Sequence, residues 1–264
     1  MQNNKNKVLK IVFLSSALLF LLAGLLISIV LSVGFGAVRI APAEILKIAQ
    51  FKILGAGSLE GIKKSAIDIV WIVRMPRILL ACLTGMGLAV TGVVMQAIVQ
   101  NSLADPYILG ISSGASLGAT LAIALGVGAK LGPNYVGLCA CFSAFGTALI
   151  VINAANIKGR ANSAKLLMAG IAISTIFSAF SSFIVFTTKN REAIRSITFW
   201  LMGGFGGAKW ENLGLLAGVI FLGIFFFMTQ YRTLNLMLLG DSVSITLGKD
   251  LHIYRQVYLL ICSA

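Results

Sequence analysis

The segment Gly110-Ile111-Ser112-Ser113-Gly114 has the G-x-S-x-G pattern of a serine nucleophile. In hydrolases with this pattern, the serine sits on a sharp turn between a strand and a helix, and a histidine acts as its base. The chain has one histidine, His252, which lies in a distant loop. We therefore assign no catalytic residues, and an intramembrane serine hydrolase is a remote alternative.

Motifs that would bind a nucleotide or a metal are also lacking in the sequence. Gly248-Lys249-Asp250 has neither the upstream glycine nor the hydroxyl residue of a phosphate-binding loop, so any ATP must be bound by another chain. The four cysteines sit in apolar segments, and Cys139 and Cys141 alone supply too few ligands for a metal. We expect no metal and no cofactor on this chain.

The composition predicts an all-α integral membrane protein. Hydrophobic residues make up 58% of the chain, charged residues 11%, and the mean hydropathy is +0.97. A helix needs about 20 mostly apolar residues to cross the hydrocarbon region. Six segments meet this length, a seventh is partial, and 196–208 is too short. The predicted spans are 11–38, 78–104, 106–129, 131–157, 166–188, 212–231 and the partial 256–264.

The net charge of +13 is spread over both ends of the predicted spans. With the N-terminus inside, nine basic residues fall inside and twelve outside, so the positive-inside rule does not fix the orientation. A basic outer face fits helix-end anchors in lipid or an acidic docking partner. No single basic face forms, so we exclude nucleic acid. The six complete spans carry no Lys, Arg, Asp, Glu or His, which weighs against ion-coupled transport.

Small residues predict close packing between helices. Gly110, Gly114 and Gly118 recur at every fourth position and would line one helix face, against another helix of the chain or a second copy. Asn101, Asp105 and Pro106 would form the turn before this helix, because proline cannot continue a helix. A plain cytoplasmic turn and a wet cavity at the membrane both fit a charged residue here.

Two further helices are expected in the loops. One begins at Pro42 and would lie on the membrane surface. The other lies in the segment 233–250, where Asp241 would be the N-cap and Gly248 would end the helix.

Three motifs resemble those of one permease family. The string VRMPRILLACLTGMGLAVTGVVMQAIVQNSLADPYILGISSGASLG, residues 73–118, resembles the signature of the FecCD/BtuC family of bacterial ABC importer permeases for iron-siderophores, haem and cobalamin. FWLMGGFGG and LNLMLLGDSVSITLG follow in the order and at spacings similar to that family's later motifs. The resemblance extends from about residue 40 to the end of the chain.

The resemblance implies a fold and a set of partners. The chain would be a single permease domain, 1–264, of the type II ABC importer fold, which has ten helices. It would sit in the bacterial cytoplasmic membrane as a homodimer or with a paralogous permease. Cytoplasmic ATP-binding subunits would hold ATP and Mg, and an extracytoplasmic substrate-binding protein would dock on the outer face.

The resemblance also implies roles for individual residues. Arg74 and Arg77 would contact acidic residues of the binding protein. The translocation path or its gate would include Asn101, Asp105, Pro106, Gly110 and Gly114. The ATPase subunits would grip the coupling segment 233–250, chiefly at Leu239, Gly240, Asp241, Ser244, Leu247 and Gly248.

Two departures from the family pattern bear on these expectations. Ser102 stands where the family usually has proline, which would loosen the turn. The chain ends at Ala264 within its seventh span, so it would be a fragment or a truncated product lacking three helices of the family fold. We expect an iron-siderophore complex as substrate because such systems dominate the family, with cobalamin or haem as the alternative.

Overall fold

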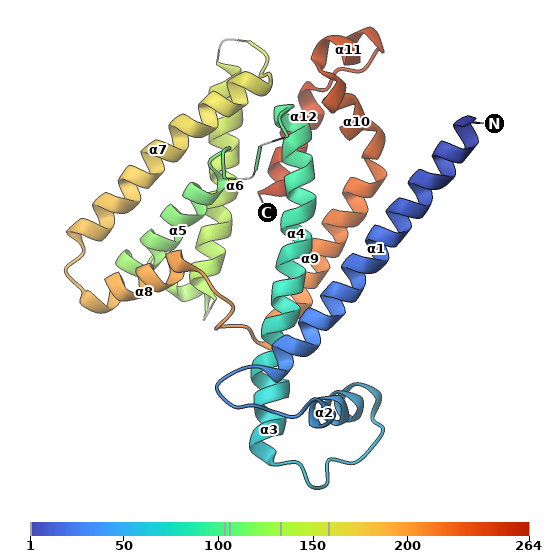
Figure 1. Cartoon of the computed structure of the whole chain (residues 1–264). Helices are drawn as coiled ribbons and strands as arrows, with labels where there is room; N and C mark the ends of the chain where they lie inside the picture. The colour runs from blue at the N-terminus through green and yellow to red at the C-terminus, as the bar shows by residue number, and fades with distance from the viewer. Residues whose placement is uncertain (1, 103, 106, 133, 158, 264) are drawn as a thin grey trace. The chain divides into compact units, whose positions relative to one another are not determined.

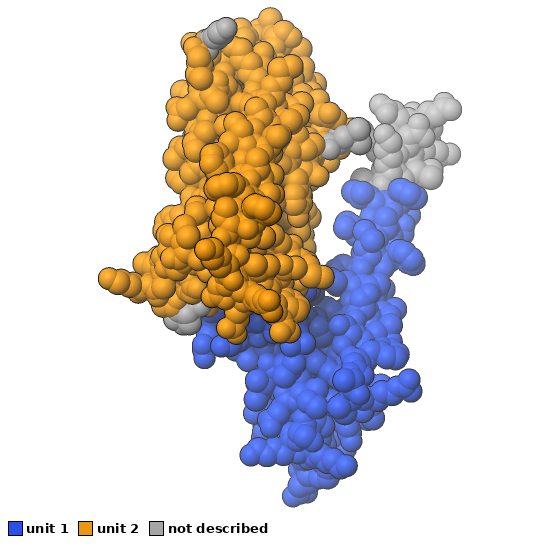
Figure 2. Space-filling model, turned by 90° about the vertical axis from the view of Figure 1, so that its left-hand side faces the viewer, with its two compact units in different colours: residues 1–83, 205–217 blue, residues 84–204, 218–264 orange. Residues whose placement is uncertain are grey.

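The computed structural model describes residues 2–102, 104–105, 107–132, 134–157 and 159–263. Every regular element within these ranges is a helix, which confirms the all-α prediction. The helices, which Figure 1 labels, fall into two compact units. One unit comprises residues 1–83 and 205–217 and the other residues 84–204 and 218–264 (Figure 2). A single permease domain over 1–264 stays a prediction.

The first unit contains three complete helices and a π-helical turn. These are α1 (Gln2–Gly34), α2 (Pro42–Leu54), α3 (Lys64–Asp68) and the π-helical turn (Ile69–Arg74). Helix α2 begins at Pro42 as predicted and ends before Gly55, whose left-handed backbone forms its C-cap. Ile45 and Ile48 of α2 pack with Val33 and Val70 in a small apolar core.

The helix from Lys64 to Val99 is longer than the predicted span 78–104. It joins α3, the π-helical turn and α4 (Met75–Val99) into 36 helical residues. The N–H of Met75 bonds to the carbonyl of Val70, five residues back, and this wider turn precedes Pro76. A proline ring clashes with the carbonyl four residues earlier in a regular α-helix, so the wider turn fits a proline at this position.

The second unit holds most of the remaining helices. They are α5 (Ile111–Leu125), the 3₁₀ turn (Ala129–Leu131), α6 (Tyr135–Asn156), α7 (Ser163–Thr187), α8 (Arg191–Met202), α10 (Tyr231–Leu239), α11 (Asp241–Thr246) and α12 (His252–Cys262). Parts of α4 and α9 (Trp210–Thr229) also belong to it. Helices α5, α6 and α7 pack side by side (Figure 1). Met95, Ile98, Leu109, Leu166 and Leu259 lie in its core.

Five described helices are long and apolar enough to cross a membrane, compared with the six complete spans predicted. The difference lies at α5, which has 15 residues where the sequence predicted a span over 106–129. Gly110 precedes α5 and Gly126 follows it, both with positive φ. Glycine adopts this backbone easily, and it ends the helix although the flanking residues remain apolar. Hydropathy alone therefore does not predict where α5 ends.

Apolar side chains cover the outside of the spanning helices. In the most apolar 18-residue stretch of α1, only 6% of the residues are buried. In the corresponding stretch of α7 the share is 11%. Phe180, Phe183 and Phe186 of α7 are all exposed. Large exposed apolar surfaces are typical of helices that face lipid, and several such helices make the chain a multi-pass membrane protein.

Candidate functional site

The glycine face of α5 packs against α6. A Cβ atom on Gly118 would lie 2.5 Å from the carbonyl oxygen of Cys139 and 2.5 Å from Cβ of Ser143. A Cβ on Gly114 would overlap the side chain of Thr147. Both glycines are buried, and the close contact is made within this chain. The role of Gly114 in a translocation path stays a prediction.

Gly110 sits where α5 begins, beside α7. Its φ is +82°, and a Cβ on it would lie 3.2 Å from the carbonyl oxygen of Gly170 in α7. Gly170 makes the reciprocal close approach, because its own Cβ would lie 2.7 Å from Cα of Leu109. The two backbones therefore meet at these glycines. The predicted place of Gly110 on the path also stays a prediction.

The serine motif lacks the geometry of a nucleophile elbow. Residues 107–110 form turns, and the described chain has no strand before Ser112. Ser113 donates a hydrogen bond to the carbonyl of Gly110 within the first turn of α5. His252 is in contact with the carbonyl oxygen of Ala161, at 3.3 Å, and with Gln256. This arrangement gives no support to the hydrolase alternative.

The predicted turn lies between α4 and α5, and Asp105 organises it. Oδ1 of Asp105 accepts hydrogen bonds from the backbone N–H groups of Tyr107, at 2.8 Å, and Ile108, at 3.2 Å. The amide of Gln96 donates to the carbonyl of Ser102 at 2.9 Å, so a side chain of α4 stabilises the turn. Asn101 is exposed beside it, and Pro106 lies outside the described residues.

The predicted coupling segment 233–250 includes most of α10 and the whole of α11, where one helix was expected. Asp241 is the first residue of α11 and not its N-cap, which is Gly240 with φ +96° and ψ 160°. Gly240 has no side chain, so no side chain caps the start of α11. Ser244 is buried and donates to the carbonyls of Leu236 and Gly240, which ties α11 to α10.

The other predicted coupling residues flank α11. Leu239 ends α10 and Leu247 is the C-cap of α11, and both are exposed. Gly248 follows with φ +78° and donates its N–H to the carbonyl of Ile245, which confirms that the helix stops there. The segment therefore presents apolar side chains around a short helix with defined ends.

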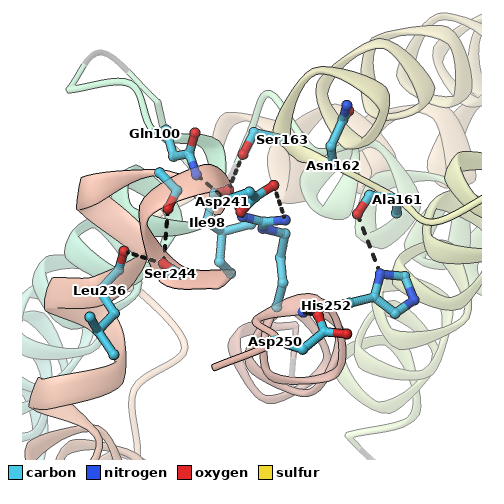
Figure 3. A network of polar contacts seen from close by, with 12 residues as sticks. Ile98, Gln100, Ala161, Asn162, Ser163, Leu236, Asp241, Ser244, Asp250 and His252 are labelled. Carbon is cyan, nitrogen blue, oxygen red and sulfur yellow. Dashed lines mark hydrogen bonds and ion pairs between the residues drawn. The ribbon is translucent and has the colours of Figure 1, made fainter. Parts of the chain in front are cut away.

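Asp241 forms an ion pair with a buried arginine of α12. Its Oδ1 lies 2.6 Å from Nη2 of Arg255 in α12, and Nη1 of Arg255 donates to its Oδ2 at 3.3 Å. Nε2 of Gln100, just after α4, lies 3.4 Å from Oδ1 of the same carboxylate. Figure 3 shows the side chains of Gln100 and Asp241 pointing toward each other.

A groove of about 440 Å³ is lined by residues of both the predicted gate and the predicted coupling segment. Its lining includes Asn101 from the predicted gate and Asp241 from the predicted coupling segment, together with Asn162 and Ser163 at the start of α7. Ser163 donates to the carbonyl of Ile98 at 3.0 Å, so the start of α7 is tied to the end of α4 (Figure 3).

A second ion pair lies on the exposed surface of the same unit. Arg160 and Asp250 are 2.6 Å apart, with side chains 78% and 55% exposed. The backbone N–H of His252 donates to Oδ1 of Asp250 at 3.0 Å. This hydrogen bond, followed by the charge of Arg160, holds the pKa of Asp250 below its ordinary value of 3.8.

The two predicted docking arginines differ in their surroundings. Arg74 is half-buried and donates to the carbonyl oxygens of Val33 and Gly34, at the end of α1, and to that of Val38. Arg77 is exposed and makes one long hydrogen bond, 3.3 Å, to the carbonyl of Gly206. Arg74 thus has a structural task in the first unit, whereas Arg77 is accessible.

The ligands of a metal ion do not gather in the described part of the chain. No group of three or more His, Cys, Asp or Glu side chains within it could hold one. Cys139 donates to the carbonyl of Val127, as a weak donor in a helical packing contact.

Sequence reasoning missed Arg255 and Gln100 as partners of Asp241. Arg255 stands directly before the partial span 256–264. A charged residue at the edge of an apolar segment is a signal for a buried partner. Which carboxylate pairs with Arg255 depends on how α11 and α12 pack against each other. The spacing of residues in the sequence does not predict this packing.

Comparison with known proteins adds a family to this geometry. Residues 24–264 match the FecCD transport family. The vitamin B12 import system permease protein BtuC of Escherichia coli O157:H7 (strain EC4115 / EHEC) is 36% identical over 189 residues, which are 71% of this chain and 56% of the relative. The BtuC protein of Klebsiella pneumoniae subsp. pneumoniae is 35% identical over 191 residues, 72% of this chain and 56% of the relative. The chain thus spans about half the length of these curated relatives.

One solved structure has a similar fold. It is described as an inward-facing conformation of a metal-chelate type ABC transporter, and it is 28% identical to this chain with a TM-score of 0.75. The match covers 94% of this chain and 73% of the solved one.

Proposed function

Since the chain belongs to the FecCD transport family, we propose that it is the membrane-spanning permease subunit of an ATP-driven importer of metal chelates. The observation that carries this proposal is the family match over residues 24–264, together with a structural likeness that covers 94% of the chain. The sequence has no phosphate-binding loop, so the energy would come from separate ATP-binding subunits that carry ATP and Mg.

The short helix α11 would be the contact for these subunits. It is six residues long, its ends are set by Gly240 and Gly248, and the apolar side chains of Val243, Ile245 and Leu247 are exposed around it. Exposed apolar side chains beside a membrane helix end suit burial by a partner protein. ATP-driven closure of the partners would move this helix and open the path to one side of the membrane or the other.

The permease would work as a dimer and receive substrate from an extracytoplasmic binding protein. A homodimer or a pair with a paralogous permease would place the path between two copies, with Asn101, Asp105 and Pro106 near its cytoplasmic end. Arg77 would contact acidic side chains of the binding protein, since it is exposed and lightly engaged.

We favour an iron-siderophore complex as the substrate, because importers of such complexes are the most frequent in the family. Vitamin B12 is the second candidate, because the curated relatives with 35% and 36% identity are named as vitamin B12 permeases. Both are metal ions held in an organic chelate, so one transport path of suitable width could serve either. Haem is a further metal chelate of the same class.

The substrate is tested by deleting the gene in its own bacterium and restoring it on a plasmid. Uptake of radiolabelled ferric siderophores, cobalamin and haem is compared in the two strains. Loss of uptake of one chelate, with recovery on complementation, supports the proposal and names the substrate. A Ser112→Ala complement should restore uptake fully if no hydrolase activity is involved. Unchanged uptake of every chelate after deletion would contradict the proposal.

A further inference from the structure

The carboxylate of Asp241 lies where three separate helical segments meet. It belongs to α11, it pairs with Arg255 in α12, and it is reached by Gln100 just after α4. We propose that the Asp241–Arg255 pair is the connection that passes a displacement of α11 on to α12, and that Gln100 extends the connection to the end of α4. The inference rests on the proposed function, in which ATP-binding subunits move α11.

The pair has the geometry of a rigid connection. Two nitrogens of the Arg255 guanidinium meet the two oxygens of the Asp241 carboxylate, at 2.6 and 3.3 Å. Such a two-point contact fixes the relative orientation of the groups as well as their separation. A rotation of α11 would therefore pull on α12 as directly as a translation would.

Burial makes Arg255 dependent on this one carboxylate. The side chain of Arg255 is 2% exposed and that of Asp241 is 39% exposed. Within the described residues, no other carboxylate forms an ion pair with Arg255, and its buried Nε has no hydrogen-bond partner. A buried guanidinium that loses its counter-charge is costly, so Arg255 and Asp241 should move together.

Polar contacts, rather than apolar packing, hold α11 in place. Of its six residues only Ser244 is buried, and Ser244 bonds to α10 and to the residue before α11. The apolar side chains of Val243 and Ile245 are exposed. The contact from α11 to α12 therefore runs through Asp241, and removing that contact should free α11 from α12 without disturbing its tie to α10.

Gln100 adds the end of α4 to this junction. It is the single non-glycine residue with positive φ in the described chain, at +57°. This conformation is uncommon for glutamine, and it directly follows the last residue of α4. The N–H of Asn101 bonds back to the carbonyl of Gln96 across this residue, and the Gln100 amide reaches Asp241. The end of α4 and the start of α11 are thus joined near the groove that also holds Asn101.

The test uses the full chain in lipid nanodiscs and in its complex with the ATP-binding subunits. The main variant is Arg255→Gln, because Arg255 is too deeply buried to contact a partner protein itself. Arg160→Gln is the matched control: it removes an ion pair of the same 2.6 Å length, but one that is exposed. The double variant Arg255→Gln with Asp241→Asn leaves no unpaired buried charge, so it covers the case in which the single variant fails to fold.

Hydrogen exchange gives the structural result. In Arg255→Gln and in the double variant, the backbone amides of Ser244 and Leu247 should exchange at least about tenfold faster, while those of α10 keep their rates. Arg160→Gln should leave both helices unchanged. Equal exchange of α11 in the wild type and in both Arg255 variants would overturn the proposal.

Transport gives the functional result. With the ATP-binding subunits, ATP hydrolysis should persist in Arg255→Gln, while the amount of chelate imported per ATP should fall about tenfold. Arg255→Lys keeps the charge but loses the two-point contact. Its import per ATP should therefore be intermediate between those of the wild type and Arg255→Gln. Import per ATP at the wild-type level in Arg255→Gln would overturn this role alone. A wild-type complex without ATP-driven import would instead overturn the proposed function.

Discussion

Arg74 donates a hydrogen bond, 3.2 Å long, to the carbonyl oxygen of Gly34, the last residue of α1. The final carbonyls of a helix have no partner within the helix, and a basic side chain near them also meets the negative end of the helix dipole. Arg74 therefore closes the end of α1. A Cβ on Gly36 would lie 2.6 Å from Nη2 of Arg74, so the glycine at position 36 leaves room for the Arg74 guanidinium.

Arg74→Gln should destabilise the chain, whereas Arg77→Gln should not. The first change removes hydrogen bonds from a half-buried charged group to three carbonyls, which we expect to cost about 1–2 kcal/mol. The second removes one exposed bond and should cost below about 0.5 kcal/mol. Thermal unfolding of both variants in one detergent measures the difference. Equal unfolding temperatures would contradict the capping role of Arg74.

Arg77→Glu should weaken binding-protein-dependent uptake about tenfold, because it reverses a charge that would face acidic side chains. Arg77→Lys should keep most of the uptake. The apparent affinity for the binding protein, measured at two salt concentrations, separates docking from later steps. If Arg77→Glu binds as tightly as wild type, the docking surface lies elsewhere. Arg74→Glu is less informative, because it would also disturb the end of α1.

Gly118→Ala should destabilise the chain by about 1–3 kcal/mol, since the new methyl group would meet the Cys139 backbone and α5 and α6 would have to separate. Gly85→Ala is the matched control in α4, where a Cβ has nothing within 4 Å. It should be neutral or slightly stabilising, because alanine favours the helix. The fraction of folded protein after mild heating in detergent reports the difference. Similar losses at both positions would argue against tight α5–α6 packing.

Gly240→Trp should uncouple ATP hydrolysis from import. The φ of +96° with ψ 160° is a backbone state for glycine, and any other residue there should cost about 1–3 kcal/mol and shift the start of α11. Gly248→Asn serves for comparison, because asparagine tolerates a positive φ. Import per ATP in proteoliposomes should fall for the first variant and hold for the second. Unchanged coupling in Gly240→Trp would remove α11 from the mechanism.

The helical class of the fold and most of the spans follow from hydropathy alone, because lipid requires long apolar helices and the sequence has them. The helix ends were less predictable. Lys64, Asp68 and Arg74 continue the helix of α4 although they are charged, because the backbone hydrogen bonds of a helix do not require apolar side chains. The end of α5 depends on the backbone of Gly126, which hydropathy ignores.

The sequence predicted a short helix between Gly240 and Gly248 but not which contacts hold it. Asp241 was expected to cap its own helix, and its carboxylate instead pairs with Arg255 in α12. Likewise, Arg74 was expected to contact a partner protein, whereas in the structure its guanidinium bonds to the carbonyl of Gly34 at the end of α1. In both cases the partner lies far away or across a turn, so only the folded chain shows which group satisfies the charge.

The central claim is that this permease moves its cargo only when ATP-binding partners drive it. The direct measurement is import of a labelled chelate into proteoliposomes that contain the chain, with and without its ATP-binding subunits and binding protein. We predict import that requires both partners and ATP, and that stops with a non-hydrolysable ATP analogue. Import at the same rate by the chain alone would contradict the account.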